Sequence, residues 1–182
     1  MEPKSRSVAV IGRFQPFHWG HFEYLIEAAR LGTQLIVGIT NPTPLQTRFT
    51  SSDVTRSSPE ANPFSYGERC EMIGLSLGRF IPQLDVQFVP GDLRSAGQLR
   101  VSLGSCDVVA LTVYDRWGEE KLSLVQEAGY DVTVLWRRSQ KMVSGTEVRQ
   151  CLASGAAWEH MVPQGTRDVI RRRIHQSEIC GQ

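Results

Sequence analysis

Five short apolar runs divide the first three quarters of the chain. They are residues 7–12 (SVAVIG), 34–40 (QLIVGIT), 85–90 (DVQFVP), 107–113 (DVVALTV) and 131–136 (DVTVLW). Each run is six or seven residues long and rich in β-branched side chains, which is typical of a strand buried inside a sheet. The pattern therefore predicts five buried β-strands.

Stretches in which apolar residues recur with helical spacing lie between these runs and after the last one. They cover about residues 19–31, 65–78, 94–103, 117–129, 146–155 and 163–176. Two of them open with the spacing of a capping box, Ser65 with Glu68 and Ser144 with Glu147, in which each side chain bonds the other residue's backbone N–H. We expect a helix to begin at each pair.

The alternation of strand and helix indicates an α/β fold. Parallel neighbours need a crossover, and right-handed helical crossovers place helices on both faces of the sheet. We therefore expect a Rossmann-like, doubly wound, five-stranded parallel sheet over about residues 7–140, with a helical C-terminal layer over 141–182, in a single domain over 1–182. In such a fold the ligand lies at the carboxyl ends of the strands, where the strand order reverses.

Composition narrows the class of partner. At 182 residues with 41% apolar side chains, the chain has the size of one domain. Its formal net charge of +1 gives no overall field that would attract nucleic acid or an anionic membrane. The four cysteines are far apart, and no apolar run is long enough to span a bilayer. We expect a cytoplasmic protein with reduced thiols and with neither nucleic acid nor membrane as a partner, while assembly into a homo-oligomer stays open.

Candidate chemistry begins directly after the first run, in residues 12–21 (GRFQPFHWGH). His18 and His21 fall in the first turn of the expected helix, and a spacing of three places them on one face. A helix N-terminus favours a phosphate, and two imidazoles add donors beside it. Gly12 permits a tight exit from the strand, and Gly20 permits the close approach of a ligand.

A zinc site is the competing interpretation of paired histidines. It needs a third ligand, and the other two histidines, His160 and His175, stand in the expected C-terminal layer with no carboxylate or cysteine pattern beside them. The sequence therefore predicts no protein metal ligand.

A second candidate anion site lies in residues 144–150 (SGTEVRQ). Ser144 and Thr146 offer hydroxyls at a helix start, and Arg149, one turn later, can hold phosphate oxygens in a fork. Because both helices begin at carboxyl ends of parallel strands, we expect the two sites to face one crevice.

One long irregular stretch, residues 41–63, follows the second run and exceeds an ordinary strand-to-helix connection. Its Pro, Ser and Thr content also fits a disordered insert. Because it carries Arg48 and Arg56 at the mouth of the expected crevice, we favour a functional lid.

These motifs resemble the nucleotidyltransferases that carry H-x-G-H and I-S-x-T-x-x-R motifs, in particular the archaeal-type nicotinamide-mononucleotide adenylyltransferases. The matching stretches, in family order, are GRFQPFHWGH (12–21), NPFSYGER (62–69), EAGYDV (127–132) and SGTEVRQCLASGAAWEHMVP (144–163). The resemblance implies attack of an acceptor oxygen on the α-phosphorus of a nucleoside triphosphate, with release of pyrophosphate and no covalent intermediate. It also implies Mg²⁺ carried mainly by the triphosphate.

The resemblance assigns roles to the motif residues. His18 and His21 bind the triphosphate, and His21 is nearest the α-phosphate. Arg13 assists, while Gly12, Phe14 and Gly20 belong to the nucleotide-binding set. The β- and γ-phosphates are held by Ser144, Thr146 and Arg149.

Three departures from that family bear on the substrate. Residues 90–103 (PGDLRSAGQLRVSL) lack the aromatic residue that stacks on the nicotinamide ring in the adenylyltransferases, the 41–63 stretch is longer, and the segment after the fourth run reads TVYDRWGEEK. These features, with GITNP closing the second run, look more like the cytidylyltransferases of phosphonate pathways. The residues expected near the base or the acceptor are Thr40, Asn41, Arg48, Arg56, Tyr114, Asp115 and Trp117.

We therefore favour transfer of CMP from CTP to a small phosphonate or phosphorylated acceptor of the 2-hydroxyethylphosphonate type. Two alternatives stay open. One is a nicotinamide-mononucleotide adenylyltransferase that uses ATP. The other is a nucleotide-sensing module without turnover, although such a module has no need of a donor that acts in the transition state.

Overall fold

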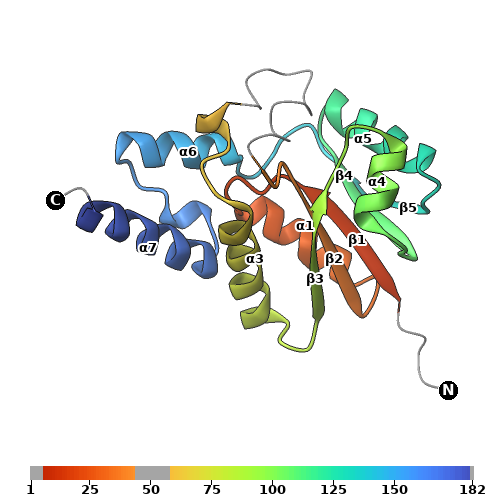
Figure 1. Cartoon of the computed structure of the whole chain (residues 1–182), viewed down its shortest axis with the longest axis horizontal. Helices are drawn as coiled ribbons and strands as arrows, with labels where there is room; N and C mark the ends of the chain where they lie inside the picture. The colour runs from red at the N-terminus through yellow and green to blue at the C-terminus, as the bar shows by residue number, and fades with distance from the viewer. Residues whose placement is uncertain (1–5, 44–57, 181–182) are drawn as a thin grey trace.

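The computed structural model of the chain describes residues 6–43 and 58–180. In this part, five parallel strands form one sheet in the order β3-β2-β1-β4-β5 (Figure 1). The strands are β1 (Ser7–Gly12), β2 (Gln34–Thr40), β3 (Asp85–Gly91), β4 (Val108–Val113) and β5 (Val132–Arg137). The α-helices are α1 (Trp19–Ala29), α3 (Tyr66–Phe80), α4 (Ala96–Leu103), α5 (Arg116–Glu127), α6 (Gly145–Ser154) and α7 (Gln164–Cys180). Short 3₁₀ turns are η2 (Pro59–Ala61) and η3 (Glu159–Met161).

Alternate residues of the strands pack into two separate hydrophobic cores, one on each face of the sheet. Val8 and Val10 of β1 point to one face and pack with α1, α3 and α7. Ala9 and Ile11 point to the other face and pack with α4 and α5. This arrangement confirms the doubly wound α/β fold and the C-terminal helical layer, because helices cover both sides of a parallel sheet.

The strand order reverses between β1 and β4. From β1 the chain winds outward through β2 to β3, and it then returns to pair β4 against the free edge of β1. The carboxyl ends of β1 and β4 therefore flank the switch point, where open sheets of this kind bind ligands. Helices α1 and α5 begin just beyond these two ends.

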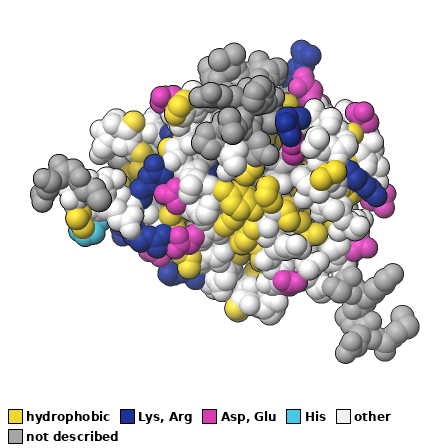
Figure 2. Space-filling model, viewed as in Figure 1, with side chains coloured by type: hydrophobic (Ala, Val, Ile, Leu, Met, Phe, Trp, Pro, Cys, Tyr) yellow, Lys and Arg dark blue, Asp and Glu magenta, His cyan; other side chains and the backbone are white. Residues whose placement is uncertain are grey.

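The observed elements follow the sequence closely, with one systematic difference. All five strands and both capping boxes are present where the pattern predicts them. However, β3 and β5 are partly exposed along their length, not buried. They lie at the sheet edges and have one strand neighbour each, and Figure 2 shows hydrophobic side chains gathered over β3.

Within the described residues, every helix is too short or too polar to cross a lipid bilayer.

Candidate active site

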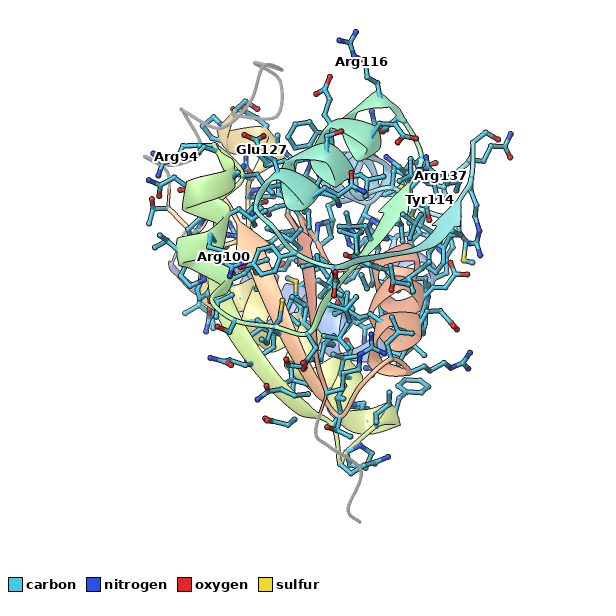
Figure 3. All side chains as sticks on the ribbon, turned by 90° about the vertical axis from the view of Figure 1, so that its right-hand side faces the viewer. Arg94, Arg100, Tyr114, Arg116, Glu127 and Arg137 are labelled. Carbon is cyan, nitrogen blue, oxygen red and sulfur yellow. The ribbon has the colours of Figure 1, made fainter. Side chains whose placement is uncertain are left out.

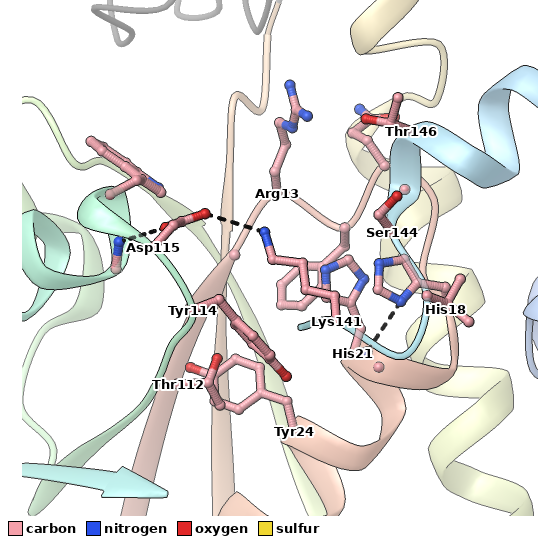
Figure 4. Close-up of a pocket in the computed structure, with 18 of the residues that line it drawn as sticks. Arg13, His18, His21, Tyr24, Thr112, Tyr114, Asp115, Lys141, Ser144 and Thr146 are labelled. Atoms are coloured by element: carbon pink, nitrogen blue, oxygen red, sulfur yellow. Dashed lines mark hydrogen bonds and ion pairs between the residues drawn. The ribbon is translucent and has the colours of Figure 1, made fainter. Parts of the chain in front are cut away.

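A pocket of about 510 Å³ opens at the carboxyl ends of β1 and β4, at the predicted switch point. Its volume is in the range of small-molecule sites. Its walls come from the end of β1 and the following loop, the start of α1, the β4–α5 turn and the segment that leads into α6 (Figure 4). Twelve residues predicted from the sequence line it: Gly12, Arg13, Phe14, His18, Gly20, His21, Tyr114, Asp115, Trp117, Ser144, Thr146 and Arg149.

The remaining predicted residues lie elsewhere. Thr40 and Asn41 do not line this pocket among the described residues, and their backbone carbonyls accept hydrogen bonds from Arg69 instead. Arg48 and Arg56, with most of the proposed lid, fall outside the described residues. The pocket thus brings the starts of α1 and α6 together with the β4–α5 turn.

His18 caps α1. Its Nδ1 accepts a hydrogen bond from the backbone N–H of His21 at 3.3 Å, and the two imidazole rings stack with centroids 3.7 Å apart. Because Nδ1 accepts this bond, a neutral His18 carries its proton on Nε2. The cap thereby fixes which nitrogen of His18 is able to donate to a ligand.

Both histidines are held in the neutral state in the free protein. Burial, with the nearby Lys141 ammonium as the next cause, lowers the pKa of His18 from 6.5 to about 3. Burial, followed by the neighbouring His18, lowers the pKa of His21 well below its ordinary value. Near neutral pH neither ring therefore carries charge, and each has a single N–H donor. The ring of His21 already bonds the backbone of Pro16 in the free protein.

Phe14 explains the glycine that precedes it. The ring of Phe14 is fully buried and meets the ring of His21 edge-on, with centroids 4.9 Å apart. A Cβ at Gly12 would lie 2.8 Å from Cζ of Phe14. Gly12 thus leaves the space that the Phe14 ring occupies. From the sequence, its expected role was to permit a tight exit from the strand.

Arg69 joins the backbone segments behind the pocket, a role that no sequence pattern indicates. Its side chain is 1% exposed, and its guanidinium donates to the carbonyls of Arg13, Thr40 and Asn41 at 2.7–2.8 Å and to Ser65 at 3.1 Å. Burial lowers its pKa to about 10, so it remains charged at neutral pH.

Two of the held carbonyls stand beside strained backbone. Phe14, which follows Arg13, has φ of 54°, and Asn41 has φ of 53°; both lie in the left-handed region. Such conformations persist where surrounding contacts over-determine them. Arg69 therefore fixes the loops at the carboxyl ends of β1 and β2.

The start of α6 is bonded to the loop after β1. Arg149 donates to the carbonyl of Gln15 at 2.5 Å and to the hydroxyl of Thr146 at 3.1 Å. Gly145 permits this approach, since a Cβ there would lie 2.6 Å from the same carbonyl oxygen. The hydroxyl of Ser144 is engaged in the capping box with Glu147. The two candidate phosphate sites are thus joined by a hydrogen bond into one wall of the pocket.

Lysines contribute to the pocket from positions that carry no motif. Lys121 of α5 donates to the carbonyl of Ile11 at 3.4 Å, and Lys141 pairs with Asp115 at 3.3 Å. Together with Arg13 and Arg149, the lining holds four cationic side chains, against the one carboxylate of Asp115 among the described lining residues. Such a concentration of positive charge in a cleft suits a polyanionic ligand.

Three polar, uncharged lining residues were also absent from the set predicted from the sequence. Gln15 bonds both backbone groups of Phe64, and the hydroxyl of Tyr24 donates to the carbonyl of Ala110 at 2.6 Å. Both line the pocket, as does Thr112. Arg116, which begins α5, instead points away from the body of the molecule, and its side chain is 92% exposed (Figure 3).

Comparison with known families agrees with this geometry. The family model described as cytidylyltransferase-like matches residues 9–151, which include every described residue of the pocket lining. The chain is 37% identical to a phosphonoformate cytidylyltransferase of Streptomyces viridochromogenes over 88% of either chain. It is 34% identical to a nicotinamide-nucleotide adenylyltransferase of Methanoculleus marisnigri over 92% of this chain and 91% of that one.

Solved structures support the fold. A bifunctional NMN adenylyltransferase/ADP ribose pyrophosphatase from Francisella tularensis superposes with a TM-score of 0.57 at 17% identity. The match covers 96% of this chain and 55% of that one, so this chain spans about half of that protein. At this level of identity the likeness shows a shared fold.

Proposed function

Because the chain belongs to the cytidylyltransferase-like family of nucleotidyltransferases, we propose that it transfers CMP from CTP to an oxygen of a small phosphonate. The observation that carries the reaction class is the joining of His18, His21 and the α6 start in one cationic pocket. The substrate assignment draws on the 37% identical relative and on the sequence after β3.

The proposed reaction is one in-line displacement. A phosphonate oxygen of the acceptor forms a bond to the α-phosphorus, while the bond from that phosphorus to the α,β-bridging oxygen breaks. The bonding electrons leave with pyrophosphate. In this scheme His18 and His21 donate N–H groups to the α-phosphate, where charge develops, and Thr146 and Arg149 hold the β- and γ-phosphates with Ser144. Positioning and charge stabilisation provide the catalysis.

The sequence from the end of β3 onward favours a small, charged acceptor. Residues 90–103 contain no aromatic side chain, so they offer no platform on which a nicotinamide ring would stack. Among the described residues, the pocket lining includes none of this segment but does include Tyr114, Asp115 and Trp117 of the β4–α5 turn, which we assign to the nucleotide side.

We propose that Mg²⁺ binds chiefly to the triphosphate. Among the side chains of the described lining residues, the oxygen ligands that Mg²⁺ prefers are the Asp115 carboxylate, a few hydroxyls and the Gln15 amide. The described residues contain no group of three or more His, Cys, Asp or Glu side chains placed to hold a metal. That donor set fits an ion coordinated mainly by phosphate oxygens and water. When bound, the ion would neutralise part of the phosphate charge.

The proposed compartment is the cytoplasm. Cys70, Cys106 and Cys151 carry free thiols, a state that the reducing cytoplasm maintains.

A second candidate is nicotinamide-mononucleotide adenylyltransferase activity with ATP. The 34% identity to the Methanoculleus marisnigri enzyme over nearly the whole chain favours it. The pocket itself serves either nucleotide, because the groups that meet the triphosphate are the same in both reactions.

A pyrophosphate-release assay tests these functions. Each of ATP, CTP, GTP and UTP is paired with 2-hydroxyethylphosphonate, phosphonoformate and nicotinamide mononucleotide, with Mg²⁺ present. We expect release with CTP and a phosphonate. Release confined to ATP with nicotinamide mononucleotide would overturn the proposal. Tight nucleotide binding with no release in any pairing would indicate a nucleotide-sensing module.

A further inference from the structure

Lys141 lines the pocket from the segment that precedes α6. Its Nζ lies 3.3 Å from Oδ2 of Asp115 and 5.5 Å from the centre of the Tyr114 ring. Figure 4 shows its side chain passing between the histidine pair and the β4–α5 turn. The lysine is therefore within the pocket and is paired, in the free protein, with an acid on the opposite wall.

The pair with Asp115 is weakly held. The two side chains are 47% and 44% exposed, and an ion pair as open to water as this contributes little free energy. Asp115 does not depend on Lys141 for its position, because its other oxygen, Oδ1, accepts the backbone N–H of Gly118 at 3.0 Å and caps α5. The lysine is thus able to leave Asp115 at low cost without disturbing the helix start.

The charge of Lys141 acts on both histidines. It is among the causes that lower the pKa of His18 and of His21, whereas Lys121 acts on His21 alone. Lys121 is also already bonded to the carbonyl of Ile11. Of the two lysines that line the pocket, Lys141 is the one placed to share a ligand with the pair.

We propose that Lys141 exchanges Asp115 for the α-phosphate when the nucleoside triphosphate binds, and that it stabilises the charge that grows there during the displacement. A charge-assisted hydrogen bond to phosphate, in a pocket closed by ligand, is stronger than the exposed ion pair that it replaces. The lysine donates hydrogen bonds and transfers no proton, so the bonds formed and broken are those of the displacement itself. This inference rests on the proposed nucleotidyl transfer.

The first experiment removes the charge. Lys141→Met is compared with Arg116→Met, which removes one positive charge from a solvent-facing position nearby on α5. We expect Lys141→Met to lower kcat/KM for the nucleoside triphosphate roughly 10- to 100-fold, the equivalent of one charge-assisted hydrogen bond. Lys141→Arg should recover most of the loss, and Arg116→Met should stay within about twofold of the wild type. Equal values for Lys141→Met and Arg116→Met would overturn the proposal.

The second experiment tests the exchange. Asp115→Asn removes the competing charge and keeps an N-cap residue for α5. The variant is made in the wild-type protein and in Lys141→Met. Calorimetry then measures how tightly each protein binds the non-reacting α,β-methylene analogues of CTP and of ATP. We expect Asp115→Asn alone to tighten binding severalfold and to have no such effect when combined with Lys141→Met. Weaker binding of Asp115→Asn in both backgrounds would overturn the exchange, because Asp115 would then hold the nucleotide directly.

The proposed function and the role of Lys141 can be refuted separately. If the wild-type protein releases no pyrophosphate with any substrate pair, the proposed function fails. The affinities for the methylene analogues still report whether Lys141 contacts a bound triphosphate, since they need no turnover.

Discussion

The imidazole of His21 lies between the buried Phe14 ring and the stacked His18 ring, and both neighbours restrict its orientation. A donor held in this way is most effective on charge that develops in the transition state. We therefore predict that His21→Ala lowers kcat by roughly 100- to 1000-fold, the loss of about 2.7 to 4 kcal/mol. Affinity for the α,β-methylene analogue of CTP should change by less than about tenfold.

His21→Asn is the matched control for this measurement, because the amide keeps an N–H donor and fills more of the space that alanine vacates. It should retain more turnover than His21→Ala at similar thermal stability. Losses of the same size in kcat and in affinity for the analogue would contradict the role of His21 in the transition state.

The neutral state of His18 has a consequence for stability. In the unfolded chain this histidine takes up a proton near its ordinary pKa of 6.5, but in the folded protein its pKa is about 3. Between these values the unfolded state binds the extra proton, so the free energy of unfolding decreases as the pH falls below about 6.5. At pH 5 the deficit from this group is about 2 kcal/mol.

We predict that His18→Asn, which retains an N-cap residue for α1, removes this part of the pH dependence. Urea unfolding of the wild type and the variant is measured at pH 7.5, 6 and 5. The wild type should lose more stability toward pH 5 than the variant, while carboxylates affect both proteins alike. Parallel curves would show that His18 is protonated in the folded state.

At the scale of elements, Arg69 links α3 to the ends of β1 and β2 through four hydrogen bonds to backbone carbonyls. Removing the donor leaves buried acceptors without partners, and each costs about 1–3 kcal/mol. We predict that Arg69→Met lowers the free energy of unfolding by about 3 to 5 kcal/mol. Arg79→Met on the same helix, which breaks an exposed pair with Asp168, should cost less than about 1 kcal/mol. Similar urea midpoints for the two variants would refute the linking role.

Local chemistry explains which elements the sequence predicts well. A strand buried by two neighbours reads as an unbroken apolar run, and a capping box needs only residues three apart, as at Ser65 and Ser144. The position of a strand within the sheet is not a local property. For that reason the runs at β3 and β5 predicted buried strands, whereas the fold places both at an edge.

At the scale of the whole molecule, local sequence patterns likewise predict only part of the candidate site. His18, His21 and the α6 start belong to short motifs whose spacing alone indicates phosphate chemistry. Lys121, the last residue of the TVYDRWGEEK stretch, and Lys141 belong to neither phosphate motif. They reach the pocket because β4 pairs with β1 and β5 pairs with β4. In the sequence, Arg69 stands out only as the last residue of the matched stretch NPFSYGER. Its role depends on carbonyls that lie 4, 28, 29 and 56 residues before it in the chain.

The C-terminal layer is attached to the sheet mainly through the packing of α7 on α3. Gly165 of α7 lies so close to α3 that an added Cβ would sit 2.6 Å from the backbone N of Ser76 and 2.7 Å from Cβ of Leu75. Real Cβ atoms do not approach this closely, so the two helices must separate to admit a methyl group.

We predict that Gly165→Ala lowers the free energy of unfolding by about 1–3 kcal/mol, the usual cost of overpacking, even though alanine has the higher helix propensity. Gly67→Ala is the control, because Gly67 lies on α3 with open space around it, so its replacement should leave stability unchanged or slightly higher. The described pocket lining ends at Arg149, and α7 therefore contributes no side chain to it. Below its melting temperature, Gly165→Ala should consequently keep the wild-type KM for both substrates. A raised KM at unchanged stability would instead place the C-terminal layer in direct contact with a substrate.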